Sequence, residues 1–317
     1  MFSLIKKRKI WFSISGILVF GSVISFLIFG LKPGIDFTGG TLMELDFLVS
    51  RPTNAKVEEI LSPLGIGNIT VQPVGESGLI LRFKEIDETT HQQIIDALEQ
   101  SLRPNTPEIE SDLEGININF QTKVLEEKQF DSIGPVIGQE LREKTIWATI
   151  IVILAIIVYI AWAFRKISKP VASWKYGVIA VIALGHDIMI TIGVFILLGQ
   201  FYNIEVNAPF VAALLTILGY SVNDTIVVFD RTRENLVRRL GQDFEEIVEE
   251  SVNEVITRSI NASFTTLLVL FAILMFGGQT IRDFVLALII GISVGTYSSI
   301  FLASPLLVTW EKLRSNK

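Results

Sequence analysis

Long apolar runs separated by polar segments dominate the chain, and they predict its helices. Each run is about 20 residues long, which is enough for a helix to cross a bilayer core of roughly 30 Å. Half of the 317 residues are hydrophobic and the mean hydropathy is +0.52, which soluble domains seldom reach. We therefore expect a polytopic α-helical membrane protein. Six transmembrane helices are predicted at 10–31, 146–164, 177–199, 209–229, 260–277 and 284–304.

A more polar segment, residues 32–144, separates the first two predicted helices and has the pattern of a soluble domain. Apolar and polar residues alternate in "TLMELDFLV", as they do on a half-buried strand. Further strands are predicted at 68–74, 78–86 and 115–125. Helices are predicted at 54–65, with Thr53 or Asn54 as cap and Gly65 as stop, and at 89–102. The order βαββαβ predicts a ferredoxin-like α+β domain.

These patterns divide the chain into three parts. Residues 1–31 form a charged N-terminus with the first helix, 32–144 the ferredoxin-like domain, and 145–317 the remaining five helices. The first apolar run is too long for the core of a signal peptide, so we expect it to remain as an anchor. In the soluble domain, His91 falls in the first turn of the second helix, and we expect it to be exposed to solvent.

Lysine and arginine gather in alternate loops, and their placement predicts the orientation. They precede the first helix at 6–9, fill the loop at 165–175, follow the fourth helix at 231–239 and end the chain, whereas the loop at 200–208 has none. By the positive-inside rule both termini face the cytoplasm, and the ferredoxin-like domain lies on the outer side. The net charge of −6 adds little to this picture. With no cysteine and only two histidines, the chain has few residues for a metal site.

Charged residues within the predicted spans are the strongest candidates for function, because a charge near the bilayer centre costs about 2.5–3.5 kcal/mol on insertion scales. Asp187 and Asp224 lie about 18 and 22 Å from the outer ends of helices three and four. Arg258 lies where helix five enters from the cytoplasmic side. Burial favours the protonated form of a carboxylic acid, and an approaching arginine favours the ionised form. Helix motion could thus couple proton binding to movement.

Each of these residues also has a purely structural interpretation. Asp224 and Arg258 could form an ion pair that only fixes the packing of two helices. Asp187 could be held by Thr191 or by a neighbouring helix. His186, the residue before Asp187, could relay protons, but we expect a hydrogen-bonded packing residue.

Other segments indicate how the helices pack. Asn223 is expected to form a hydrogen bond between helices, and the spacing of Gly291 and Gly295 in "GISVG" allows two helix backbones to approach closely. The segment 244–256, "FEEIVEESVNEVI", places its apolar residues on one face. It predicts an amphipathic helix on the cytoplasmic membrane surface before helix five.

Four motifs together resemble the SecF family of protein-export membrane proteins, which with SecD falls in the resistance-nodulation-division superfamily. They are "PGIDFTGGTLMEL" after the first helix, "SIGPVIGQEL" before the second, "GYSVNDTIVVFDRTREN" in the fourth and "TRSINASFTTL" in the fifth. The likeness extends over nearly the whole chain. It implies an auxiliary subunit of the bacterial Sec translocase that pairs with SecD. Such a subunit uses the proton-motive force to help draw exported polypeptide from the SecYEG channel, while SecA supplies the ATP-driven step.

The resemblance also implies roles for single residues. It assigns Asp224, the aspartate of "VNDT", and Arg258, the arginine of "TRSIN", to a proton pathway that a SecD aspartate completes. Asp187 matches an acidic position whose role is open. Glycines and a proline near the domain boundaries are either hinges or plain turns. They are Gly39 and Gly40, where the chain enters the ferredoxin-like domain, and Gly134, Pro135 and Gly138, where it leaves that domain.

The resemblance further implies the bacterial inner membrane, contact with lipid, no cofactor, no nucleic-acid partner and no enzymatic activity. Three rivals remain. An intramembrane aspartyl protease would need "YD" and "GxGD" contexts, which Asp187 and Asp224 lack. A proton-coupled exporter of the same superfamily usually has twelve helices. A passive scaffold for translocase assembly stays open, as do the exported substrates and the choice between H⁺ and Na⁺.

Overall fold

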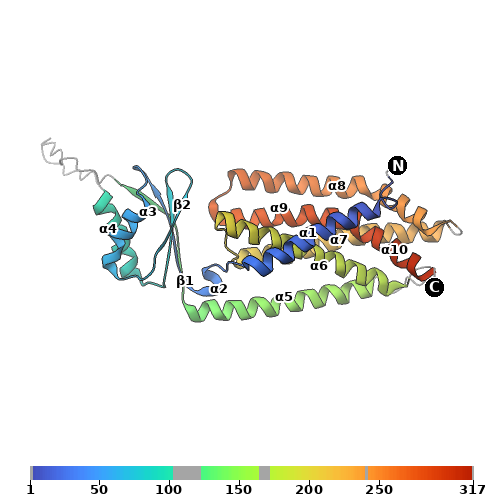
Figure 1. Cartoon of the computed structure of the whole chain (residues 1–317), viewed down its shortest axis with the longest axis horizontal. Coiled ribbons are helices and arrows are strands. Elements are labelled where there is room, and N and C mark those ends of the chain that lie inside the picture. Colours follow the sequence, from blue (N-terminus) through green and yellow to red (C-terminus); the bar gives the residue numbers. More distant parts are fainter. Residues whose placement is uncertain (1–2, 103–122, 164–171, 240–241, 316–317) are drawn as a thin grey trace, which may run out of the picture. The chain divides into compact units, whose positions relative to one another are not determined.

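The computed structural model describes residues 3–102, 123–163, 172–239 and 242–315, and the chain divides into two compact units (Figure 1). Met1–Pro33 and Lys144–Lys317 form a helical unit, called the bundle unit below. Gly34–Glu143 form a mixed unit, called the sheet unit.

The sheet unit has the topology that the sequence predicts. Four strands form one antiparallel sheet in the order β2-β3-β1-β4. Two helices, α3 (Asn54–Leu61) and α4 (Glu88–Leu102), connect them in the order βαββαβ, preceded by the short α2 (Ile35–Thr38). The strands are β1 (Gly40–Phe47), β2 (Thr70–Val74), β3 (Gly78–Phe83) and β4 (Leu125–Ile133). This is the ferredoxin-like arrangement.

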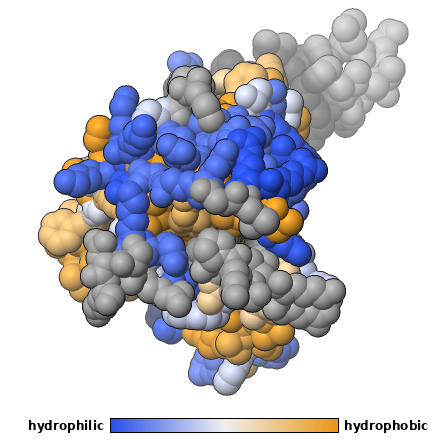
Figure 2. Space-filling model, turned by 90° about the vertical axis from the view of Figure 1, so that its right-hand side faces the viewer, coloured by the Kyte–Doolittle hydropathy of each residue, from blue (hydrophilic) through white to orange (hydrophobic). Residues whose placement is uncertain are grey.

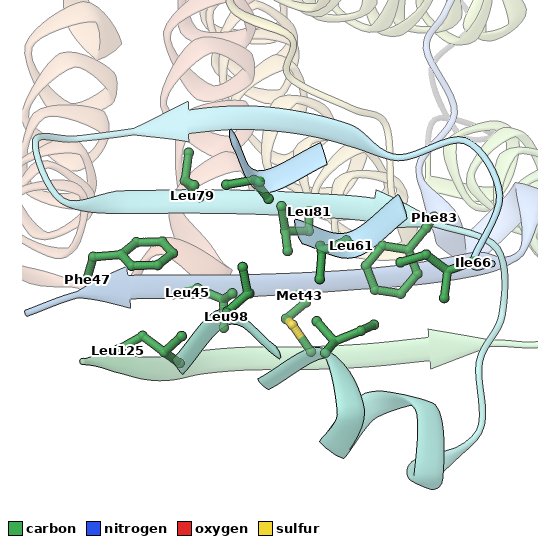
Figure 3. Close-up of a cluster of buried hydrophobic side chains, with 12 residues drawn as sticks. Met43, Leu45, Phe47, Leu61, Ile66, Leu79, Leu81, Phe83, Leu98 and Leu125 are labelled. Carbon is green, nitrogen blue, oxygen red and sulfur yellow. The ribbon is translucent and has the colours of Figure 1, made fainter. Parts of the chain in front are cut away.

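One face of the sheet and the two helices enclose the core of this unit (Figure 3). Alternate residues of β1 and β3 point toward the helices because side chains alternate across a strand. Thr53 caps α3 as predicted, accepting a hydrogen bond from Lys56 N at 3.4 Å, and Gly65 ends the following turn with φ +65°. The buried side chains include Met43, Leu45, Phe47, Val57, Leu61, Leu79, Leu81, Phe83, Ile94 and Leu98.

One prediction for this unit is not tested and one needs correction. The strand predicted at 115–125 lies almost wholly outside the described residues, and the last strand that the structure describes is β4. His91 is buried, not exposed. Its ring stacks on Phe130 of β4, and its Nε2 lies 3.0 Å from Glu127 Oε1. The first turn of α4 is covered because β4 lies beneath it.

The bundle unit contains six described helices that are long and apolar enough to cross a membrane, as predicted. The last of them is interrupted by a π-helical turn, η2 (Ser299–Ala303), between α9 (Gln279–Ser298) and α10 (Ser304–Ser315). The other five are α1 (Arg8–Phe29), α5 (Pro135–Ala163), α6 (Ser173–Tyr202), α7 (Ala208–Arg238) and α8 (Phe244–Phe276).

Within this unit, α9 contacts α6, α7 and α8, and α1 packs on α6 (Figure 1). Helix α5 is mostly exposed and is seated on the bundle mainly through Ile160, which contacts Gly177 of α6. Exposed apolar surface of this kind suits a lipid environment.

The segment 244–256 is not a separate helix on the membrane surface. It forms the first third of the continuous α8, because nothing in the sequence breaks the helix between this segment and the span. Its apolar face packs against Val228 of α7, Ile5 near the N-terminus and Val308 of α10.

Hydrophilic side chains gather at the end of the bundle unit that carries both termini (Figure 2). Ion pairs join different helices there. Arg8 pairs with Glu245 at 2.9 Å, and the buried Lys175 with Glu311 at 2.9 Å. Arg231 contacts Glu254 between the ends of α7 and α8. Of the basic residues predicted to mark this side, Arg165, Lys166, Lys169 and Lys317 lie outside the described residues.

Candidate functional site

Asp187 of α6 is fully buried and joins three helices. Its Oδ2 accepts a hydrogen bond from Ser221 Oγ of α7 at 2.5 Å and from Ser298 Oγ of α9 at 2.8 Å. Thr191, an expected partner, donates to the backbone oxygen of Asp187 instead. Neighbouring helices therefore hold this carboxylate, and its several donors offset part of the cost of burying it.

Hydroxyl groups continue from Asp187 along the seam between α7 and α9. Thr225 Oγ1 lies 2.9 Å from Ser299 Oγ, and Thr225 also donates to the backbone oxygen of Ser221. Ser299 begins the π-helical turn η2. Such turns are uncommon and often occur at functional sites.

His186 is buried beside Asp187, and only one of its ring nitrogens has a partner. Nδ1 lies 2.9 Å from Asp187 Oδ1, whereas Nε2 has no hydrogen-bond partner among the described residues. The ring lies next to Tyr297 of α9, with 6.3 Å between ring centroids. The fully hydrogen-bonded packing histidine expected from the sequence is thus found only in part.

Asp224 lies one turn after Ser221 on α7 and faces α8. Its side chain is buried near Ser259, but neither Asp224 Oδ2 nor Ser259 Oγ has a hydrogen-bond partner in the part of the chain described. A buried carboxylate oxygen without a partner is costly and suggests a function or a missing neighbour.

Arg258 is not paired with Asp224 in this structure. It is exposed and makes no ion pair with any described residue. Ser259 points toward α7, and successive residues on a helix point about 100° apart, so Arg258 points outward. Asn223 is likewise exposed, and the hydrogen bond predicted for it does not form within the described chain.

Exposed small and polar residues occur on α7 and α8, the two helices that carry Asp224 and Ser259, and are together called the polar stripe below. They occupy the middle of two helices that should face lipid, where polar side chains usually meet another helix. The stripe consists of Thr216, Gly219 and Asn223 of α7 and Thr257, Arg258, Asn261 and Thr265 of α8.

Gly291 and Gly295 lie where α9 crosses α7. A Cβ atom at Gly291 would clash with the Ile217 side chain, and one at Gly295 would be 2.9 Å from Ser221 Cβ. These glycines therefore let α7 approach closely enough for Ser221 and Ser298 to reach the same carboxylate oxygen.

The glycines at the domain boundaries form a backbone crossing in the sheet unit. A Cβ atom at Gly39 would be 2.8 Å from Pro135 Cα, and one at Gly138 would be 2.9 Å from Gly39 N. A Cβ atom at Gly40 would be 2.9 Å from Phe83 O, and one at Gly134 would be 3.1 Å from Glu85 Oε1. Close approach of two chain segments thus requires glycine here, and a hinge role stays a prediction.

The sequence analysis missed four hydroxyl residues of the site: Ser221, Ser259, Ser298 and Tyr297. Sequence spacing could have indicated that small and hydroxyl residues share one face of each helix, since residues three or four apart lie on the same side. These residues are Ser221 and Thr225 on α7, and Gly291, Gly295 and Ser298 on α9. Among the residues described, no group of three or more histidine or acidic side chains could hold a metal ion.

Comparison with known proteins gives a consistent result. The family described as "Protein export membrane protein SecD/SecF, C-terminal" matches residues 114–313, and the "SecD/SecF GG Motif" matches 24–47. A protein translocase subunit SecF from Thermobaculum terrenum is 40% identical, with 98% of this chain and 94% of the relative covered. The corresponding subunit from Anaerolinea thermophila is 37% identical, with the same coverage.

The fold is also similar to a solved structure. The crystal structure of SecDF from Thermus thermophilus, a translocon-associated membrane protein, matches with a TM-score of 0.78 and 30% identity. The match covers 98% of this chain but 39% of the SecDF chain. The chain thus spans well under half the length of that longer protein.

Proposed function

The chain belongs to the SecF family of protein translocase subunits, and from this premise we propose that it uses the proton-motive force, together with SecD, to assist polypeptide export through SecYEG. Asp224 is the residue that binds and releases the proton in this proposal. Arg258 is the positive charge that controls it, and Asp187 contributes to the same pathway. SecA acts on the same exported polypeptide from the cytoplasmic side.

The observation that carries the proposal is the incomplete environment of Asp224. Its Oδ2 is buried and has no hydrogen-bond partner among the described residues, Ser259 of α8 lies beside it, and Asn223, next to it in sequence, is exposed. A site of this kind is completed by water, a proton or a neighbouring subunit.

The position of Arg258 supports a coupling step. In the present arrangement it is exposed and points away from Asp224, so that, among the described residues, it makes no ion pair with this carboxyl group. A small rotation of α8 would bring the guanidinium toward Asp224, favour the ionised form and release the proton. Alternation between these arrangements would convert proton flow into helix movement.

The polar stripe supports SecD as the partner. A helix of SecD packed there would bury Asn223, Arg258 and Asn261, and could supply the further acidic residue that the family resemblance implies. The hydrophilic end with both termini would face the cytoplasm of a bacterial inner membrane. The sheet unit follows α1 in the chain, so one membrane crossing would bring it to the outer side.

Asp224→Asn tests the proposal. The amide cannot exchange a proton, so we expect the stimulation of export by a proton gradient to fall by at least tenfold, toward the level without SecD and SecF, while assembly with SecD stays normal. The matched control is Asp230→Asn, an exposed position two turns along α7 that should have no effect. Unchanged stimulation in Asp224→Asn would refute proton coupling, and loss of assembly would favour a passive scaffold.

A further inference from the structure

His186 is the one buried imidazole of the bundle unit, and the coupling proposed for Asp224 does not use it. It lies where three helices meet. Ser22 of α1 contacts Gly193 of α6, so two turns earlier in each of these parallel helices Ser15 lies near His186. Ser15 Oγ is 3.3 Å from Tyr297 Oη, which donates to the backbone oxygen of Trp11.

The hydrogen bonds of Asp187 indicate which ring nitrogen of His186 carries a hydrogen atom. Ser221 and Ser298 both donate to Oδ2, so we begin from the state in which Asp187 is a carboxylate. The remaining oxygen, Oδ1, then accepts a hydrogen bond from His186 Nδ1. In this state the imidazole is neutral, its Nε2 lone pair is buried without a donor, and the pair carries one negative charge.

One added proton neutralises the pair. It can be written as an imidazolium beside a carboxylate, or as a neutral imidazole beside a carboxylic acid. In both descriptions one hydrogen lies between Nδ1 and Oδ1, and the other is bound to Nε2. The proton therefore enters and leaves at Nε2, the atom that has no partner among the described residues.

We infer that His186 and Asp187 form a second proton-binding pair of the proposed pathway, which titrates separately from Asp224 and holds its exchangeable proton at His186 Nε2, where α1, α6 and α9 meet. This inference rests on the proposed proton coupling and adds a site to it. The other titratable group beside His186 is Tyr297 of α9, while α1 contributes Ser15 and Trp11. Asp224 faces α8, away from this contact.

The chain offers a direct test because it has only two histidines. The full-length protein, labelled with ¹⁵N-histidine and placed in lipid, gives one set of ring signals for each, and His91→Gln assigns them. We expect the His186 Nε2 signal to change from bare nitrogen to N–H when the sample is acidified. An Nε2 that keeps one state over the whole pH range in which the protein stays folded would overturn the inference.

Two variants separate this site from Asp224. In Asp187→Asn the charge partner is gone, so the protonation of His186 Nε2 should be lost over most of this pH range. In Asp224→Asn the titration of His186 should persist, and its disappearance would show one coupled site instead of two. A silent His186 together with lost export in Asp224→Asn would reject the second site alone. A titrating His186 with normal export in Asp224→Asn would reject the proposed function of Asp224.

Discussion

At the scale of single residues, the molecule keeps several polar groups in apolar surroundings, and their partners decide what each can do. Asp187 has a polar partner on each oxygen, whereas one oxygen of Asp224 and one ring nitrogen of His186 have no hydrogen-bond partner in the described part of the chain. In the sheet unit, His91 shows the contrasting case, since Glu88 and Glu127 contact its two ring nitrogens. The hydrogen-bond partners of these residues therefore depend more on the elements packed against them than on their position along a helix.

Glu44 of β1 provides a pH-dependent test in the sheet unit. Burial, followed by the nearby negative charge of Asp46, raises the pKa of Glu44. An acid with a raised pKa loses stability as the pH rises from its ordinary value through its folded value. We therefore expect Glu44→Gln to raise the melting temperature of the sheet unit at pH 7, and the gain to vanish in acid, where the wild-type carboxyl is protonated in both states.

Glu126 is the matched control, because its hydrogen bond to Lys128 lowers its pKa. Glu126→Gln should have the opposite sign, with a small loss of stability at pH 7 that disappears as the pH falls through the folded pKa. Calorimetry of the full-length protein at neutral and acidic pH measures both. A lower melting temperature for Glu44→Gln at pH 7 would contradict the assignment.

At the scale of elements, periodicity was enough for the long helices and for β1 and β3, where apolar side chains fill the inward positions. It failed for β4, whose inward positions include Glu127 and Ser132 and whose register shifts at a bulge opposite Glu44 and Leu45. Those polar residues are satisfied by His91 and Thr41 from other elements. A pattern read along one segment cannot reveal partners that are distant in sequence.

The backbone crossing at Gly39 gives a prediction at this scale. Gly39 has φ +73°, and a Cβ atom there would be 2.8 Å from Pro135 Cα. Gly39→Ala should therefore destabilise the sheet unit by roughly 2–4 kcal/mol, from the left-handed backbone and the backbone clash together. The control is Gly65→Ala, with φ +65° and open space around it, which should cost about 1–2 kcal/mol.

Hydrogen exchange of the β1 and β4 amides in the full-length protein measures the stability that each of these two variants loses. Equal costs for Gly39→Ala and Gly65→Ala would mean that the crossing segments yield easily, which would favour a hinge over a fixed contact.

At the scale of the whole molecule, the sequence located the candidate acids but not their surroundings. Asp187, Asp224 and Arg258 stand out because charge is rare in apolar runs. The serines around Asp187 do not stand out, since serine is common in membrane helices. The outward direction of Arg258 depends on how α8 is rotated against α7, which periodicity alone does not determine.

The polar stripe predicts which side of the bundle unit meets SecD. The chain has no cysteine, so a single introduced thiol can carry a photo-cross-linker without background. Asn261→Cys should cross-link to SecD in membranes, whereas Ile151→Cys, on the exposed surface of α5, should label lipid. Equal cross-linking at both positions would contradict the assigned interface.

The π-helical turn at Ser299–Ala303 determines the directions in which the side chains of α10 point. The additional residue in that turn rotates α10 by about 100° about the helix axis, relative to an unbroken α-helix. Gly295 can thus lie against Ser221 of α7 and Ser298 can donate to Asp187 of α6, while Glu311 and Lys312 further along the helix pair with Lys175 and Glu245. Deleting one residue of this turn would rotate α10 relative to α9. The helix could then keep the hydrogen bond of Ser298 or the ion pairs of Glu311 and Lys312, but not both.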